Sequence, residues 1–245
     1  MKRNLVLVGD IHGEYRTLVW KITNQYQMKD TDIVVLGDFG VGFDNTMTHN
    51  YKWSEKKLED SGNMIYTLRG NHDDPLYFTD ESKYSYPRLI FMEDYKLYTL
   101  GDDRVILPIG GANSIDIEDR LKNNQKWASM GSDRRCWWED EDVKRVDPET
   151  LPLKVDIILS HESPLVFDPI PSRPDICPVY QYEKILSTRK YLSTIIDKTN
   201  TDNWFFGHYH THLSGTYGKV LWRCLDIMEF YQAPEKKNNN PQGEI

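Results

Sequence analysis

The sequence contains little cysteine. Its 245 residues include three cysteines, which is an odd number, and no two of them form a Cys-x-x-Cys pair. A disulfide framework needs an even set of cysteines and a thiolate zinc site needs paired ones, so the sequence argues against both. We expect reduced thiols, as is usual in the cytoplasm.

Long hydrophobic runs are also missing. The first apolar run covers only Leu5–Val8 and ends at Gly9. Secretory signals and membrane spans need much longer apolar stretches. We therefore expect a cytoplasmic protein that makes no use of a membrane.

Dense runs of basic residues do not occur, and the formal net charge is −8. Duplex nucleic acid would need a local basic patch, so nucleic acid is not the favoured partner. Bound divalent cations would add positive charge at one spot, so a phosphate ester remains compatible with this charge. No Walker or dinucleotide-binding fingerprint is present. The oligomeric state is not fixed by the sequence.

What the sequence does contain is a series of apolar runs that read as short buried strands. Five of them end in a polar cluster, and these runs cover residues 5–8, 33–36, 64–68, 155–159 and 204–206. Helical spacing of apolar residues predicts helices at about 15–26, 53–61 and 180–198. Alternation of strand and helix indicates parallel strands joined by crossover helices.

The middle of the chain follows another pattern. Short polar turns separate the runs 89–92, 96–100 and 104–109, which predicts an antiparallel meander, and 220–227 predicts one more strand. We therefore expect an α/β fold with mixed sheets, a four-layer αββα sandwich in one domain over residues 1–232. Residues 114–150 are irregular and charged but hold three tryptophans, which favours an ordered insert or lid. Residues 233–245 are predicted to be a disordered polar tail.

The five polar clusters hold five of the seven histidines, three aspartates and one asparagine. Side chains that follow parallel strands collect beyond the carboxyl ends of the sheet. Nitrogen and oxygen ligands of this kind suit a pair of divalent metal ions in a hydrolytic enzyme. Neighbouring glycines allow the backbone to turn sharply.

The motifs make the family recognisable. Asp10-x-His12, Gly37-Asp38, Gly70-Asn71-His72-Asp73, His161 and Gly207-His208-x-His210 resemble, in order, the blocks of the calcineurin-like metallophosphoesterase superfamily. Residues 68–73 look like the same block in protein phosphatases. The stretch from Gly110 is similar to the insert of small phage and bacterial members.

The resemblance implies two divalent ions, a metal-bridging hydroxide that attacks phosphorus in line, and Asp38 as the shared ligand. The implied ligands are Asp10, His12, Asp38 and His210 for one ion, and Asp38, Asn71, His161 and His208 for the other. His72 would protonate the leaving oxygen or stabilise the transition state, and Asp73 would hold the His72 tautomer. Manganese is our first expectation for the metal, with iron, zinc, cobalt and nickel as alternatives.

One departure bears on the substrate. Gly37-Asp38 continues as Phe39-Gly40, without the phosphate-binding arginine that many protein phosphatases carry after this block. Candidate substrate-binding residues must then lie elsewhere, and we consider Arg69, Asn113, Arg120, Trp137 and Trp138. Arg120 has an equally simple structural or solvated interpretation, and the two tryptophans have one as anchors of the insert.

The favoured function is a metal-dependent phosphomonoesterase that acts on a phosphoprotein or a small molecule. A phosphodiesterase acting on cyclic nucleotides or on RNA or DNA ends is the alternative. A different class of function, a metal-binding scaffold without catalysis, is disfavoured because His72 and every implied ligand position are filled.

Overall fold

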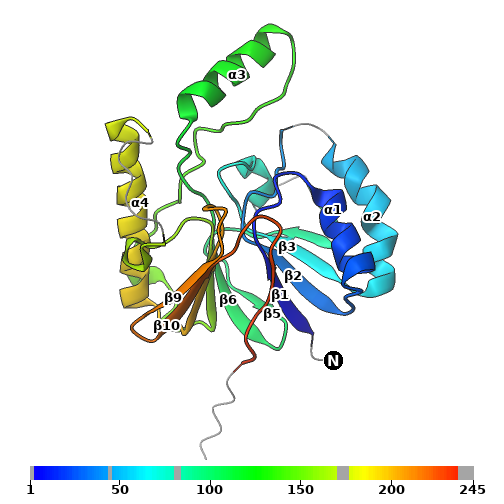
Figure 1. Ribbon diagram of the computed structural model, residues 1–245, viewed down its shortest axis with the longest axis vertical. Coiled ribbons are helices and arrows are strands. Elements are labelled where there is room, and N and C mark those ends of the chain that lie inside the picture. Colours follow the sequence, from blue (N-terminus) through cyan, green and yellow to red (C-terminus); the bar gives the residue numbers. More distant parts are fainter. Residues whose placement is uncertain (1–2, 44–45, 80–83, 170–176, 237–245) are drawn as a thin grey trace, which may run out of the picture.

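The computed structural model describes residues 3–43, 46–79, 84–169 and 177–236. Two β-sheets pack face to face, and helices cover the outer face of each sheet (Figure 1). The predicted four-layer α/β sandwich with two mixed sheets is therefore confirmed. No helix in the described ranges is long and apolar enough to cross a membrane.

The first sheet has five strands in the order β11-β1-β2-β3-β4. Its strands are β1 (Asn4–Val8), β2 (Thr31–Val35), β3 (Met64–Thr67), β4 (Leu89–Phe91) and β11 (Phe230–Gln232). β1 to β4 run parallel to one another, and β11 pairs antiparallel with β1. The carboxyl ends of β1, β2 and β3 consequently meet at one edge of the sheet.

The second sheet has six strands in the order β5-β6-β7-β8-β10-β9. Its strands are β5 (Tyr98–Leu100), β6 (Arg104–Ile109), β7 (Ile157–Ser160), β8 (Asn203–Phe206), β9 (Leu213–Tyr217) and β10 (Val220–Cys224). β6, β7, β8 and β10 are parallel, and β5 and β9 close the two edges antiparallel.

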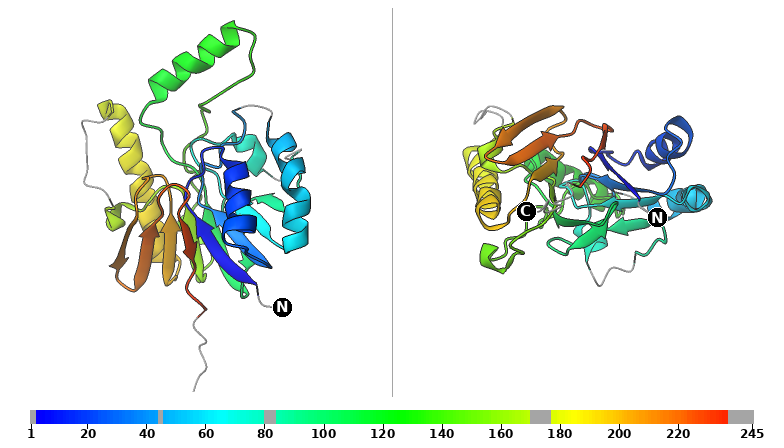
Figure 2. Two further views of the ribbon diagram at one scale, coloured as in Figure 1. Left: turned by 45° about the vertical axis from the view of Figure 1, so that its right-hand side comes forward. Right: turned by 90° about the horizontal axis from the view of Figure 1, so that it is seen from below.

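Helices from separate parts of the chain form the outer layers. The longer helical elements are α1 (Tyr15–Trp20) with its π-helical continuation η1 (Lys21–Gln25), α2 (Met47–Ser61), α3 (Ile117–Ser129) and α4 (Val179–Lys198). Short 3-10 turns are η2 (Pro75–Phe78), η3 (Pro148–Thr150) and η4 (Leu165–Phe167). α1 and α2 lie over the first sheet, α4 lies over the second, and α3 stands away from both (Figures 1 and 2).

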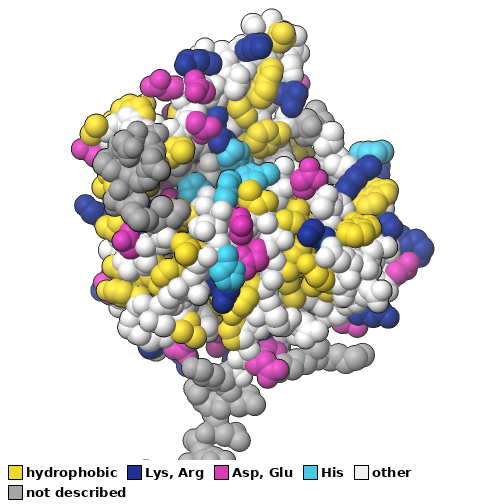
Figure 3. All heavy atoms as spheres, viewed as in Figure 1, with side chains coloured by type: hydrophobic (Ala, Val, Ile, Leu, Met, Phe, Trp, Pro, Cys, Tyr) yellow, Lys and Arg dark blue, Asp and Glu magenta, His cyan; other side chains and the backbone are white. Residues whose placement is uncertain are grey.

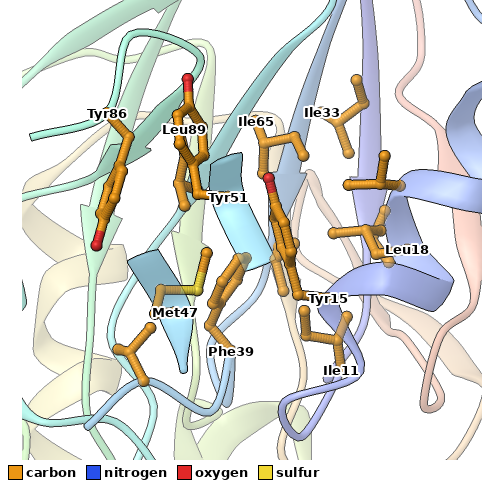
Figure 4. Packing of buried hydrophobic residues seen from close by; sticks show 14 of the residues in the cluster. Ile11, Tyr15, Leu18, Ile33, Phe39, Met47, Tyr51, Ile65, Tyr86 and Leu89 are labelled. Atoms are coloured by element: carbon orange, nitrogen blue, oxygen red, sulfur yellow. The ribbon is translucent and has the colours of Figure 1, made fainter. Parts of the chain in front are cut away.

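Strand alternation divides the core among the three interfaces between these layers. In β1, Val6 and Val8 pack in the cluster with α1 and α2, whereas Leu5 and Leu7 pack in the cluster between the sheets. Figure 4 shows the first of these clusters, where α1 and α2 side chains meet the sheet. A third cluster joins the second sheet to α4. Successive residues of a strand point to opposite faces, so a strand buried on both faces reads as a continuous apolar run.

Some predicted elements differ from the structure. The predicted meander is wrong for its first run, because β4 joins the first sheet parallel to β3 and only β5 and β6 pair antiparallel. α2 begins at Met47, six residues before the predicted start at Trp53. The sequence patterns also missed β9, whose residues are half-buried or exposed, and the three-residue β11.

The predicted tail divides into two parts. Residues 237–245 lie outside the described residues. Ala233 is buried, and its amide donates to the Leu5 carbonyl at 3.0 Å. Lys236 forms an ion pair with Asp156 at 2.9 Å, so the chain stays against the body as far as this residue.

Candidate metal centre

The ends of five parallel strands bring the predicted ligands together. Asp10 and His12 follow β1, Asp38 follows β2, and Asn71 follows β3, while the second sheet contributes the residues after β7 and β8. Figure 3 shows histidine side chains gathered on the face below α3. The site therefore lies where the carboxyl ends of both sheets meet.

One predicted set of four ligands forms a compact group. Ligand atoms of Asp10, His12, Asp38 and His210 all lie within 4.8 Å of one another. His210 Nε2 lies 3.2 Å from Asp10 Oδ2, and it lies 2.9 Å from His12 Nε2. Two imidazole nitrogens and two carboxylates that aim at one point suit a divalent metal ion.

The second predicted set surrounds His161, which is completely buried. Its Nε2 lies 3.2 Å from Asp38 Oδ1 and 3.1 Å from Asn71 Oδ1, and its ring centroid is 4.9 Å from that of His208. His161 Nδ1 donates to the Leu36 carbonyl at 2.8 Å. Because a carbonyl only accepts, Nδ1 carries a proton. In the neutral form of the ring, the Nε2 lone pair therefore points toward the site.

The backbone at the site adopts conformations that few residues take. His12, Asp38, His208 and His210 all have positive φ angles, between 44° and 69°. Non-glycine residues rarely adopt this region, and such strain concentrates at functional sites. The fold therefore holds these four residues in a backbone conformation that non-glycine residues disfavour.

Two glycines let the strand ends approach the carboxylates closely. A Cβ atom at Gly70 would overlap Asp38 Oδ1, and one at Gly207 would overlap Asp10 Oδ1. The amide of His72 donates to Asp38 Oδ1 at 2.8 Å. These glycines leave the space that the two carboxylates occupy.

Electrostatics at the centre favour bound cations. Burial alone would raise the pKa of the Asp38 carboxyl, but His161, His72 and His12 hold it well below its usual range. Burial alone would lower the pKa of His161, yet Asp38 and Asp10 raise it to about 10. The two buried carboxylates thus attract positive charge, and a divalent cation held by this donor set would take the place of the His161 proton.

His72 lies beside the metal ligands. Its Nε2 is 3.9 Å from Asp38 Oδ2. Arg120 Nη1 lies 2.9 Å from its Nδ1, and Arg120 Nη2 lies 2.5 Å from its Nε2. Burial lowers the pKa of His72 to about 4, with Arg120 acting in the same direction and Asp38 opposing. The Phe43 ring is nearly parallel to the imidazole, with 6.0 Å between centroids. Arg120 comes from α3, so the insert supplies a cation directly to the predicted catalytic histidine.

Asp73 occupies a different environment from the one expected. Its buried carboxylate accepts hydrogen bonds from the amides of Phe39, Gly40, Val41 and Gly70, at 2.7–3.2 Å. Within the described residues it has no hydrogen bond to the His72 ring. In the structure, Asp73 therefore holds the loop after Asp38 in place.

Arg69 and Asn113, two of the candidate phosphate ligands, are buried in the scaffold. The Arg69 guanidinium is fully buried and donates to the backbone carbonyls of Asp140, Glu141 and Asp142 at 2.8–3.0 Å. Asn113 is likewise buried, against the Thr188 hydroxyl of α4 at 2.9 Å. The structure does not bring these two side chains to the metal centre, because both are occupied in joining the insert to the body.

The two candidate tryptophans differ in position. Trp138 is 7% exposed, and its ring meets the Phe43 ring edge to face at 5.6 Å. Phe43 in turn covers His72, so Trp138 belongs to the surroundings of the site. Trp137 is half-buried, and its carbonyl accepts from Asn124 of α3 at 2.9 Å.

Several residues near the site were missed by sequence reasoning. Glu162 is buried, with Oε2 3.8 Å from His208 Nε2, and it accepts from the Tyr209 hydroxyl. The Ser114 hydroxyl accepts from Asn71 Nδ2 at 2.9 Å, and Glu141 accepts from Ser114. The position of Glu162 beside His161 was a usable signal, whereas nothing local distinguishes Ser114 or Glu141 from other polar residues of the insert.

Comparison with known proteins identifies the family of the chain. The family model described as calcineurin-like phosphoesterase matches residues 3–212, so the chain belongs to this family of phosphoesterases. Comparison with curated protein sequences gives no match.

Similar solved structures have low sequence identity. A phosphopantetheinyl hydrolase from Mycobacterium tuberculosis is 13% identical, with a TM-score of 0.49 and 99% of each chain covered. TT1561 of Thermus thermophilus is 11% identical, with a TM-score of 0.49, covering 93% of this chain and 91% of that one. A putative 5'-nucleotidase from Staphylococcus aureus is 12% identical, with a TM-score of 0.41, covering 93% and 49%.

Proposed function

We propose that the protein is a dinuclear metal-dependent phosphomonoesterase. The observation that carries the proposal is that the six other predicted ligands lie in two groups on either side of the Asp38 carboxylate. Asp38 contacts the first group through His12 at 3.8 Å and the second through His161 at 3.2 Å. A carboxylate placed between two such groups can bridge two ions.

Two divalent ions held by these ligands would lower the pKa of a water molecule and offset the charge of a phosphate ester. The remaining residues position and stabilise the reacting groups. His72, next to Asp38, can donate an N–H to the leaving oxygen. Asp73, which follows β3, accepts hydrogen bonds from amides of the loop after β2, and the His72 amide donates to Asp38. These bonds fix the distance between His72 and Asp38.

Arg120 supports a monoester substrate. A phosphomonoester carries more negative charge than a diester, and a guanidinium binds phosphate oxygens in a planar, paired fashion. The Arg120 side chain is 11% exposed and lies against His72. Its guanidinium lies close to the metal centre with Asp116 paired to Nε at 2.5 Å, whereas the arginine of the protein phosphatase motif is absent after Asp38.

A phosphodiesterase acting on a nucleotide is the second candidate. The Phe43 ring lies next to His72, and the Trp138 ring packs against Phe43. Aromatic faces stack on nucleobases. Manganese is the metal we propose first, since mixed imidazole and carboxylate ligands accept it readily. The same ligands also accept iron, zinc, cobalt and nickel.

The proposal is tested with an aryl phosphate monoester in the presence of manganese. Loss of partners of metal ligands usually costs about 10–100-fold, so removing a ligand in Asp38→Ala or His208→Ala should cost more than about 100-fold in kcat/KM. His49→Ala, at an exposed position on α2, is the matched control and should keep wild-type activity. Full activity in both ligand variants would exclude the proposed site.

The same assay with a bis-aryl phosphate compares the rates of hydrolysis of the two substrate classes. We expect the monoester to be hydrolysed faster, and Arg120→Ala to slow the monoester more than the diester. A strong preference of the wild-type protein for the diester would place the nucleotide phosphodiesterase first. A protein that binds two manganese ions but hydrolyses neither ester would be a scaffold.

A further inference from the structure

A buried chain of hydrogen bonds runs from the insert to a predicted metal ligand. Asn71 Nδ2 donates to Ser114 Oγ at 2.9 Å, and Ser114 Oγ donates to Glu141 Oε2 at 2.6 Å. The backbone amide of Ser114 donates to Glu141 Oε1 at 2.8 Å. All three side chains are at most 2% exposed, so water does not compete for these groups.

The chemistry of this chain fixes its direction. Both oxygens of Glu141 accept hydrogen bonds, so the single hydroxyl proton of Ser114 is directed to Glu141. The Ser114 oxygen can then only accept, and the amide NH2 of Asn71 is the group it accepts from. The other end of the carboxamide, Oδ1, consequently faces His161 Nε2 at 3.1 Å.

We propose that Ser114 and Glu141 are positioning residues that orient Asn71 so that its oxygen, not its NH2 group, faces the metal. This inference rests on the proposed function, in which Asn71 is a ligand of the second ion. An NH2 group has no lone pair to offer a metal, so a reversed carboxamide would remove that ligand. The insert then helps to build the metal centre.

The chain is itself held rigidly by the body of the protein. The Glu141 carbonyl accepts from Arg69 Nη1 at 2.8 Å and from the amide of Ala112 at 3.1 Å. Gln181 of α4 donates to the Ser114 carbonyl. Outer partners that fix a ligand in this way usually contribute about 10–100-fold to metal affinity.

Manganese titration of the full-length protein, by calorimetry and by electron paramagnetic resonance, tests the inference. Wild type should bind two ions. Ser114→Ala and Glu141→Gln should each weaken one of them by about 10–100-fold and leave the other unchanged. The glutamine NH2 can donate to Ser114, which turns the hydroxyl proton toward Asn71 and favours the reversed carboxamide. Ser129→Ala, an exposed serine of α3, is the matched control.

Replacement of Asn71 by aspartate separates orientation from packing. An aspartate has oxygen at both ends and needs no partner to orient it. In an Asn71→Asp background, Ser114→Ala and Glu141→Gln should therefore leave manganese affinity within about twofold. A packing role would weaken binding in both backgrounds and would overturn the inference, as would unchanged affinity in the two single variants. Absence of manganese binding by wild type would instead contradict the proposed function.

Discussion

Asp38 combines an unusual backbone conformation with a buried side chain and close neighbours. It has a positive φ of 45°, it is buried, and its two oxygens face different groups of ligands. Gly70 leaves the space that its carboxylate occupies. Strain in the backbone and close approach to a neighbouring strand end are both consistent with a side chain fixed for metal binding.

Asp73 shows how a motif residue can act through the backbone. Four amides of the loops after β2 and β3 converge on its carboxylate. Without it, these amides would lose their acceptor, and each buried group left unpaired costs about 1–3 kcal/mol.

We therefore expect Asp73→Ala to lower the free energy of unfolding by at least about 3 kcal/mol, as measured by urea denaturation. Asp133→Ala, at an exposed position in the insert, is the control and should change little. If Asp73 served only to orient His72, kcat would fall while the unfolding free energy stayed at the wild-type value.

At the scale of elements, the insert between β6 and β7 is attached to the rest of the protein through buried contacts. Arg69, at the end of β3, donates to three successive carbonyls of the segment that returns from α3, and it pairs with Asp94 at 3.2 Å. α3 itself buries no residue, so its position depends on these contacts and on those of Arg120. The insert is thereby an extension of the fold and not a free linker.

Arg69→Met tests this attachment. The change removes the guanidinium from Asp94, which keeps the Gly110 amide and the more distant Lys144, and it leaves three backbone carbonyls without their donor. Breaking a buried ion pair typically costs about 3–5 kcal/mol. We expect a loss of stability of that order in denaturant, together with faster cleavage inside residues 115–140 during limited proteolysis. Arg135→Met, an exposed arginine of the same insert, should show neither effect. A raised KM with unchanged stability and unchanged proteolysis would instead support the prediction that Arg69 binds phosphate.

At the scale of the whole molecule, the metal centre joins the two sheets. Asp10, Asp38 and Asn71 follow strands of the first sheet, whereas His161 and His208 follow strands of the second. Ions bound between them would link the two halves of the sandwich and would bind only the folded chain. Binding of this kind stabilises a protein by mass action.

Removal of metal should therefore lower thermal stability. At a manganese concentration of 100 times the dissociation constant, binding of one ion adds about 2.7 kcal/mol, which raises Tm by about 5–10 °C for a chain of this size. A thermal scan with excess manganese and another with a chelator measure this difference. Asp38→Ala should lose most of the shift, and an equal Tm of the wild-type protein in both conditions would argue against a metal bridge between the sheets.

The sequence by itself determined the class of fold and the polar clusters from which the ligand set is proposed. Metal chemistry allows few residue types, and those residues follow apolar runs whose burial on both faces is visible in the pattern. It could not assign β4 to its sheet, because an apolar run of three or four residues does not reveal its partner strand.

Only the tertiary structure decided which other side chains reach the site. Arg69 lies two residues before Asn71 in the sequence, yet it points into the scaffold, where backbone carbonyls of the insert surround it. Arg120 lies 48 residues from His72 and contacts its ring. Ser114 and Glu141 likewise reach Asn71 only because the insert folds back. Contacts of this kind depend on long-range packing, for which a local pattern of residues carries no signal.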